Sequence, residues 1–192
     1  ISTLLPSALL SGGTSPTRER LDTARAQASQ TRRMMIGAQE ELDWRCYRLY
    51  GLLPSSATSA DVEYGGTVEV ELGERAFEIV LARRIAAGRV HTRWFDRHGS
   101  TPVTDIPKHW PEGYRRVAQR RIEMIESDKT IGLIERAEFK RRWNSPSWED
   151  LERAALREWL LNRLEASQLL PSSADNPPQL TTVNRLADAV RA

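Results

Sequence analysis

The stretch from Thr17 to Tyr50, which has no proline and only one glycine, constrains the fold of this chain more than any other feature. Apolar residues recur in it at every seventh position, and this spacing predicts a single helix of about 35 residues, roughly 50 Å long. A helix with such an apolar stripe cannot bury the stripe alone, so we expect a partner helix from this chain, from a region outside it or from a second copy. The apolar residues of the repeat are Leu21, Ala28, Met35, Leu42 and Leu49.

Residue types at both ends of this stretch set the boundaries of the helix. Ser15 is suited to cap the N-terminus and Pro16 to occupy the first helical position. Gly51, with a proline soon after it, is a usual stop pattern. We therefore assign residues 15–52 to a long, coiled-coil-like helix and residues 1–14 to a flexible lead-in.

Stretches rich in proline, glycine and serine divide the remainder of the chain. Residues 53–66 are interpreted as a linker, residues 67–167 as a helical C-terminal domain and residues 168–192 as a proline-containing tail. Residues 67–72 are expected to be a short strand or an extended lead-in. The fold class predicted is mostly α, with a long N-terminal helix followed by a compact multi-helix domain. Helices are expected at 74–87, 112–127 and 147–166, a shorter helix or a turn followed by a helix at 131–143, and a last short helix at 182–190.

Composition excludes several classes of protein. Apolar residues make up 40% of the 192 residues, enough for a core, yet no run approaches the roughly 18 apolar residues of a membrane-spanning helix. The N-terminus has no secretory signal pattern, so we expect a cytoplasmic location and no membrane partner. The first residue is not methionine, which suggests a piece of a longer chain. The single cysteine, Cys46, excludes an internal disulfide and a cysteine-based zinc site. The spacing of His91, His98 and His109 matches no metal signature, so no metal is expected.

Charge is distributed unevenly along the chain. The net charge is only +2, but residues 61–78 hold six acidic residues and one arginine, a net charge of −5. Residues 83–121 hold ten basic and three acidic residues, a net charge of +7. This asymmetry indicates an anionic partner more strongly than the total charge does. The 25 arginines against 3 lysines suit phosphate recognition, although GC-rich codon usage explains the same bias.

The helix expected at 112–127 carries the best candidates for contact with an anion. Three of its arginines lie outside its apolar arc, where they can reach phosphates without disturbing a core, and three more basic residues precede the helix. The alternative is a solvated helix face that Glu112 and Glu123 balance. The candidate DNA-binding residues are Arg93, Arg97, Lys108, Arg115, Arg116 and Arg120.

Two other residues of the basic segment have predicted environments of their own. Arg121 projects into the apolar arc, so we expect its guanidinium to be paired or to snorkel toward water. Trp110 lies between a histidine and a proline and is expected to be the most exposed of the six tryptophans.

No residue of the chain qualifies as catalytic. The string Asp175-Asn176-Pro177-Pro178 is similar to one that amino-methyltransferases acting on adenine use, but an aromatic residue follows there and Gln179 follows here. The chain has no glycine-rich cofactor loop and no nucleophile elbow. We therefore expect no catalytic residue and no cofactor in this chain.

Six motifs spread over most of the chain, about residues 15–166, are long enough to be specific. They are residues 40–52 (EELDWRCYRLYGL), 71–84 (ELGERAFEIVLARR), 94–102 (WFDRHGSTP), 106–111 (IPKHWP), 131–136 (IGLIER) and 140–144 (KRRWN). The first resembles a segment near the C-termini of large adenine-specific DNA methyltransferases and fused restriction-modification enzymes. The others resemble the C-terminal region of the methyltransferase of the BREX (phage growth limitation, Pgl) defence system.

The resemblance implies a parent enzyme that methylates the N6 amine of adenine with S-adenosylmethionine and marks host DNA in a phage-defence system. It also implies that the catalytic domain precedes Ile1, so no catalytic residue carries over. The leading hypothesis is a non-catalytic C-terminal module that packs on the upstream methyltransferase domain and helps to position double-stranded DNA through weak backbone contacts. The alternatives are a docking module for other defence-system subunits and a purely structural cap on the long helix.

Overall fold

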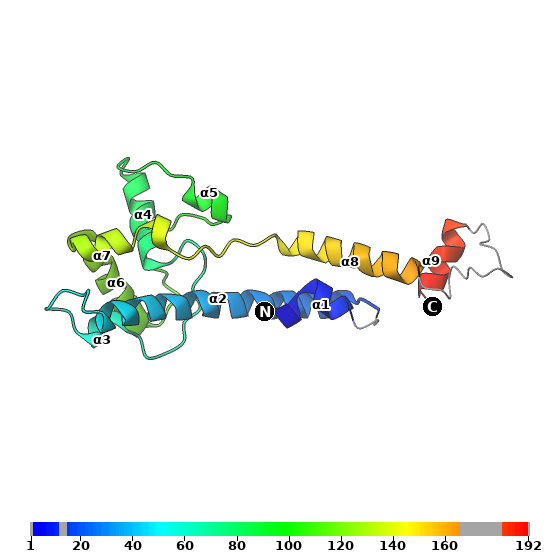
Figure 1. Cartoon of the computed structure of the whole chain (residues 1–192), viewed down its shortest axis with the longest axis horizontal. Helices are drawn as coiled ribbons and strands as arrows, with labels where there is room; N and C mark the ends of the chain where they lie inside the picture. Colours follow the sequence, from blue (N-terminus) through cyan, green and yellow to red (C-terminus); the bar gives the residue numbers. More distant parts are fainter. Residues whose placement is uncertain (1, 12–14, 166–181, 192) are drawn as a thin grey trace. The chain divides into compact units, whose positions relative to one another are not determined.

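The computed structural model describes residues 2–11, 15–165 and 182–191, which form helices joined by turns and extended segments with no strand among them. This confirms a mostly α fold with one long helix and several further helices (Figure 1). The elements are η1 (Ser2–Leu4), α1 (Pro6–Leu10), α2 (Arg18–Leu49), α3 (Ser59–Val62), α4 (Ala76–Ala86), α5 (Trp94–His98), α6 (Glu112–Ser127), α7 (Lys129–Ile134), η2 (Ala137–Phe139), α8 (Trp148–Leu164) and α9 (Val183–Arg191).

The long helix α2 begins and ends close to the predicted boundaries. It starts at Arg18 rather than at Pro16, and Thr17 caps it, because the Thr17 hydroxyl accepts a hydrogen bond from the backbone N–H of Arg20 at 3.4 Å. Gly51, with a φ of 65°, ends it in the left-handed conformation that glycine adopts without strain.

Two compact units divide the chain. Ile1–Ala28 and Pro146–Ala192 form one, called the terminal unit below, and Ser29–Ser145 form the other, called the central unit. Helix α2 contributes its first residues to the terminal unit and the rest to the central unit. The predicted domain boundaries after residues 52, 66 and 167 stay predictions.

The terminal unit is held by contacts between α1 and α8. Helix α1 packs against α8, and Leu10 at the end of α1 is buried. Residues 2–10 are therefore largely helical, although the sequence indicates a flexible lead-in there. Helix α8 begins as predicted, because the Ser147 hydroxyl accepts a hydrogen bond from the backbone N–H of Asp150 at 3.1 Å.

The central unit has two apolar clusters. The larger one forms around Trp44 of α2 and joins α4, α5, α6 and α7. The smaller one joins Ile36 of α2 to Tyr114 of α6 and to the extended segment 67–72, where Val68 and Val70 are buried. Of the two predictions for 67–72, the extended lead-in is confirmed.

Gly37 allows the extended segment to cross α2 at close range. The backbone N–H of Val70 donates to the Arg33 carbonyl at 3.2 Å, one helical turn before Gly37. A Cβ atom at position 37 would lie 2.2 Å from the Val68 carbonyl oxygen, so no larger residue fits without a backbone shift. The one glycine inside α2 is therefore a contact point rather than a weak point of the helix.

The buried face of α2 in the central unit differs from the predicted seam. Ile36 and Trp44 face the core together with Glu40, whereas Met35 and Leu42, which belong to the seven-residue repeat, are exposed. No helix of the described residues buries this part of the repeat, so of the three predicted sources of a partner helix, a region outside the chain and a second copy stay predictions. Ile36 and Trp44 determine which face of α2 is buried in the central unit, because they are its largest buried side chains. They lie eight residues apart on one face of the helix and do not belong to the repeat.

Arg121 is paired, as predicted, but does not snorkel. Its side chain is completely buried, and Nε donates to the Val62 carbonyl at 2.9 Å while Nη2 lies 2.7 Å from Oε1 of Glu41. The guanidinium of Arg121 thereby ties the last residue of α3 to both α2 and α6.

The prediction that Trp110 is exposed is wrong, since only 4% of its surface is accessible. Its indole Nε1 donates to the Glu69 carbonyl at 3.2 Å, and its ring packs edge-on against Tyr114. The extended segment and α6 together bury the Trp110 ring. The proline and histidine next to Trp110 in the sequence do not indicate this burial.

A second buried ion pair lies at the start of α4. The Arg75 guanidinium contacts Glu78 at 2.8 Å, and the Trp94 indole N–H donates to the same carboxylate at 3.0 Å. Burial alone would raise the pKa of Glu78, but these hydrogen bonds outweigh it and hold the pKa below its ordinary value.

Candidate nucleic-acid interface

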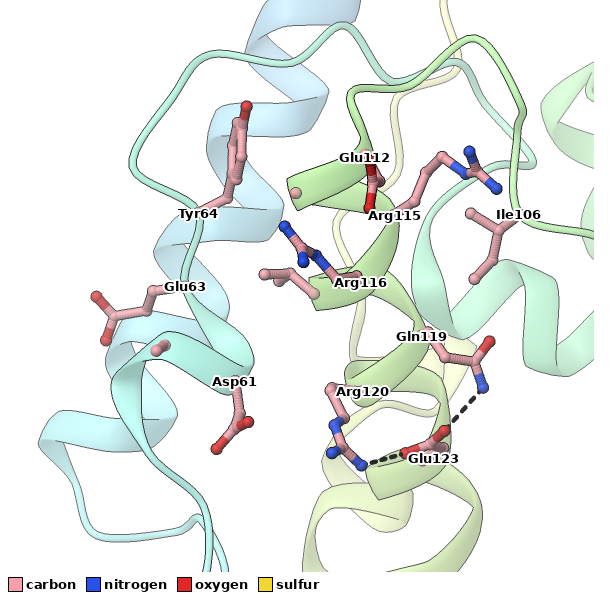
Figure 2. A pocket seen from close by; sticks show the side chains of 13 residues that line it. Asp61, Glu63, Tyr64, Ile106, Glu112, Arg115, Arg116, Gln119, Arg120 and Glu123 are labelled. Carbon is pink, nitrogen blue, oxygen red and sulfur yellow. Dashed lines mark hydrogen bonds and ion pairs between the residues drawn. The ribbon is translucent and has the colours of Figure 1, made fainter.

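Helix α6 has one buried face and one exposed face that carries arginines. Tyr114, Val117 and Ile122 pack inward, whereas Arg115, Arg116 and Arg120 are exposed, as their positions outside the apolar arc predict. Beside the exposed face lies a groove of about 930 Å³, lined by α6, by residues 60–64 and by Ile106 (Figure 2). The three arginines predicted on this helix therefore share one groove, called the α6 groove below.

The three arginines differ in their partners. Arg120 Nη1 lies 3.0 Å from Oε2 of Glu123, and Gln119 donates to the same carboxylate at 2.9 Å. The hydrogen bonds from Gln119 and Arg120 lower the pKa of Glu123 (Figure 2). Within the described residues, the guanidiniums of Arg115 and Arg116 have no hydrogen bond and no ion pair. These two side chains are therefore the ones free to bind an outside anion.

Carboxylates also line the α6 groove, but most have partners of their own. Asp61 accepts hydrogen bonds from the hydroxyl and backbone N–H of Thr58, which lower its pKa. Glu63 pairs with Arg48 and lies 3.6 Å from Arg45, both on α2. Glu123 is held by its own pair, so among the described residues only Glu112 lines the groove without a hydrogen bond or an ion pair from its carboxylate.

The remaining predicted residues do not join this groove. Arg93 precedes α5, Arg97 lies within it, and Lys108 lies in the loop before α6. All three side chains are exposed, and none lines the α6 groove. The structure thus brings together half of the candidate DNA-binding set.

The acidic segment 61–78 does not neutralise the basic segment 83–121. Arg33 of α2 lies 2.7 Å from Glu69 and 3.3 Å from Glu71, and Arg75 pairs with Glu78 inside the acidic segment itself. Hydrogen bonds from Gln30 and Arg33 lower the pKa of Glu69. Most acidic side chains of the segment are therefore engaged by α2 or locally, and the exposed basic residues of 83–121 other than Arg120 have no ion pair among the described residues.

Two glycines allow the ring of Tyr64, which lines the α6 groove, to approach the backbone closely. A Cβ atom at Gly66 would lie 2.7 Å from the Tyr64 ring, and one at Gly113 would lie 3.3 Å from it. The Tyr64 ring therefore lies close against backbone and packs edge-on against Tyr114. The sequence alone did not predict this close approach, because Gly65-Gly66 reads as part of a linker. A glycine placed just after an aromatic residue was the available signal.

The described residues form neither a candidate metal cluster nor a membrane-spanning helix. No cluster of histidine, cysteine, aspartate and glutamate there is able to hold a metal ion, and none of the helices described combines the length and apolarity needed to span a bilayer. His98 is buried, with Nδ1 2.6 Å from the Trp94 carbonyl oxygen, while His91 and His109 are exposed. The string Asp175–Pro178 lies outside the described residues.

Comparisons with known proteins agree with the resemblance seen in the sequence. The family model described as a domain of unknown function, DUF7008, matches residues 35–192. The chain is 47% identical over 171 residues to an adenine-specific methyltransferase, PglX, of Streptomyces coelicolor. The match covers 88% of this chain but only 14% of that methyltransferase. No solved structure matches the chain.

Proposed function

Because the chain belongs to the DUF7008 family and matches a small part of a methyltransferase, we propose that it is a non-catalytic segment that helps an adenine-specific DNA methyltransferase hold its duplex. The segment would contact the DNA backbone. Contacts of this kind position a duplex and carry no sequence information.

One observation carries the proposal, namely the exposed guanidiniums of Arg115 and Arg116, which have no partner in the described residues. They lie on consecutive positions of a rigid helix whose other face is anchored in the core. Because a guanidinium presents a planar fork of donors, it suits phosphate oxygens better than a lysine ammonium does. Arg93, Arg97 and Lys108 would add longer-range attraction from outside the groove.

Arg120 is expected to contribute less than its neighbours. Its ion pair with Glu123 would have to be broken or shared before it binds a phosphate. Exposed pairs of this type are weak, about 0–1 kcal/mol, so the contribution is reduced rather than abolished.

The direct test measures binding of the chain to a fluorescent duplex at several salt concentrations. The chain should bind weakly, with a Kd of about 10⁻⁴–10⁻⁶ M at physiological salt. The double variant Arg115→Gln with Arg116→Gln should weaken binding to all sequences alike. It should also reduce the log–log salt slope by about 0.9 for each phosphate that the variant no longer neutralises. Adding Arg120→Gln should change the slope less.

Three arginines of the terminal unit provide a matched control. Arg18, Arg25 and Arg153 are exposed and each lies near a carboxylate, so their replacement by glutamine removes the same charge as the triple variant of α6. The control should retain the parent's affinity and slope. If both triple variants lose the same amount of affinity, the loss comes from the change in net charge and not from the α6 groove. An absence of duplex binding at low salt would overturn the proposal.

The mixed charge of the α6 groove favours a second candidate function. Four carboxylates, Asp61, Glu63, Glu112 and Glu123, line it beside the three arginines. A protein surface presents charges of both signs, whereas a duplex presents phosphates alone. If the chain fails to bind DNA at low salt, docking of another subunit becomes the better proposal.

The function proposed for the whole enzyme rests on the matched methyltransferase and on the resemblance seen in the sequence. The name of the matched protein describes an adenine-specific methyltransferase. This supports the proposal that the whole enzyme uses S-adenosylmethionine, with a cofactor site outside this chain, and acts in phage defence. Calorimetry with this chain should accordingly give no heat of S-adenosylmethionine binding at micromolar concentrations.

A further inference from the structure

An apolar stripe runs along the outside of α2 in the central unit. Met35, Leu42 and Leu49 are 40%, 53% and 68% exposed and lie at intervals of seven residues, with Ala38 and Arg45 between them. These five residues are called the α2 outer stripe below. Positions spaced by three and four residues lie on one face of a helix, so the stripe is the seam that a second helix would cover.

The stripe is distinct from the face that stabilises the central unit. Ile36, Glu40 and Trp44 are buried on a neighbouring face of the same helix turns, so the unit already has its core without the stripe. Side chains of the stripe are therefore available to another surface without any rearrangement of the core. The stripe also lies outside the α6 groove, so its use does not depend on DNA contact.

Arg45 sets the charge of the surface that the stripe fits. Its side chain is 61% exposed in the middle of the stripe, and its nearest carboxylate is Glu63, at 3.6 Å. Arg48 pairs with the same Glu63 and is 40% exposed. One carboxylate thus serves two guanidiniums, and the stripe keeps a positive charge that a partner with a carboxylate would compensate.

A second copy of the chain fits the stripe poorly. Two copies would place Arg45 against Arg45 in a parallel pair and about 9 Å from it along the axis in an antiparallel pair centred on Leu42, so like charges oppose both pairings, the parallel one more strongly. The seam from Met35 to Leu49 is about 21 Å long, and a helix contact about 10 Å wide over that length falls short of the roughly 1,200 Å² of a stable interface. A short stripe is sufficient only if its partner is tethered, because tethering raises the effective concentration to about millimolar.

We propose that the α2 outer stripe docks an amphipathic helix that carries a carboxylate opposite Arg45 and belongs to the remaining part of the methyltransferase polypeptide. The length of the relative supports a tethered partner, because this chain spans only 14% of it. The inference rests on the family match and not on the DNA contacts proposed above.

Thiol labelling tests the proposal in the longer enzyme and in this chain alone. Both proteins carry Cys46→Ala, and Leu42→Cys then introduces one thiol into the stripe. Because Leu42 is exposed, this change should leave the fold intact, which circular dichroism checks. The thiol should react with a maleimide at least about tenfold more slowly in the longer enzyme than in the chain alone. Glu126→Cys on α6, also at an exposed position, serves as the matched control and should react equally in both.

Two further variants in the longer enzyme address charge and partner identity. Arg45→Glu should restore rapid labelling of the thiol introduced by Leu42→Cys, because it opposes the partner's carboxylate, and Arg45→Gln should do so less. Equal labelling rates in the longer enzyme and in the chain alone would overturn the proposal. Protection that appears in the chain alone and grows with its concentration would identify a second copy as the occupant and would also overturn it.

Discussion

The two parts of α2 bury different faces and use different chemistry to do so. In the terminal unit the helix buries the first two residues of the seven-residue repeat and an alanine between them, and all three are apolar. In the central unit the repeat is exposed, and the buried face carries aromatic and charged side chains. One helix therefore needs no single seam, because each unit selects the face that its own neighbours can cover. The buried residues are Leu21, Ala24 and Ala28 in the first part and Ile36, Glu40 and Trp44 in the second.

The largest expected effect comes from the buried guanidinium of the central unit. Arg121→Ala leaves the Glu41 carboxylate and the Val62 carbonyl without their partner, so unfolding free energy should fall by about 3–5 kcal/mol. Urea denaturation followed by circular dichroism measures the change. The exposed neighbour Arg120→Ala is the control and should cost less than about 1 kcal/mol. Similar destabilisation in the two variants would mean that Arg121 is not the anchor of this unit.

The register of α2 makes the next largest difference. Ile36 is 1% exposed and Met35 is 40% exposed, although the two are consecutive. Ile36→Ala should destabilise the protein by about 2–5 kcal/mol, and Met35→Ala should cost a small fraction of that. Thermal or urea unfolding compares them directly. A larger destabilisation by Met35→Ala than by Ile36→Ala would mean that the seven-residue repeat, and not the face of Ile36, packs in the core.

A pH-dependent effect is expected from Glu40, which has no counterpart in the terminal part of α2. Burial raises the pKa of Glu40 to about 7, despite the opposing charge of Arg121 and the hydrogen bond from the Ala76 N–H. Between about pH 4.5 and 7 the folded protein holds a proton that the unfolded chain releases, so stability falls as the pH rises through this window.

Replacement of Glu40 isolates this pH dependence. Glu40→Gln cannot ionise, so its stability relative to the parent should increase from pH 4.5 to pH 7, by on the order of 2 kcal/mol. Unfolding curves at pH 4, 5.5 and 7 give the trend. The pH 4 measurement is the reference, because Glu40 is mostly protonated there in both the folded and the unfolded protein. A constant difference across the three values would contradict the buried, proton-binding carboxylate.

The smallest effect is expected in the terminal unit. Arg18 lies 2.9 Å from Glu152, but its side chain is 66% exposed, so water screens the pair. Arg18→Ala should leave the unfolding free energy almost unchanged. A change that approaches that of Arg121→Ala would remove the contrast between the two parts of α2.

The positions of the long helices α2, α6 and α8 were predictable from sequence, while the short helices α1 and α3 and the buried face of α2 were not. Ser147 with Asp150 and the glycine at position 51 act locally, so the start of α8 and the end of α2 follow from short motifs. The buried face of α2 depends on partners far along the chain. Glu40 looks like a solvent-facing residue until the backbone N–H of Ala76 is placed against it.

The candidate site was predictable to a similar extent. The outward positions of Arg115, Arg116 and Arg120 follow from helical periodicity alone, and the structure agrees. The groove beside them depends on the hydrogen bond between Arg121 and the Val62 carbonyl, which are 59 residues apart. No local pattern reports such a long-range interaction. The other three candidates, Arg93, Arg97 and Lys108, share only their charge with the α6 arginines, and charge along the sequence does not determine which side chains share a surface.

The adjacent positions of Arg120 and Arg121 restrict how the length of α6 can vary. One guanidinium faces water and the next is fully buried. An inserted residue upstream in the helix would rotate the following part by about 100° and move Arg121 into the buried position of Ile122, which brings an unpartnered cation into the core. A deleted residue would move Arg121 to the exposed position of Arg120 and remove the tie to Val62. We therefore expect insertions and deletions to be tolerated in the turns around α3 and excluded from residues 112–121, which insertion scanning with a folding reporter can measure.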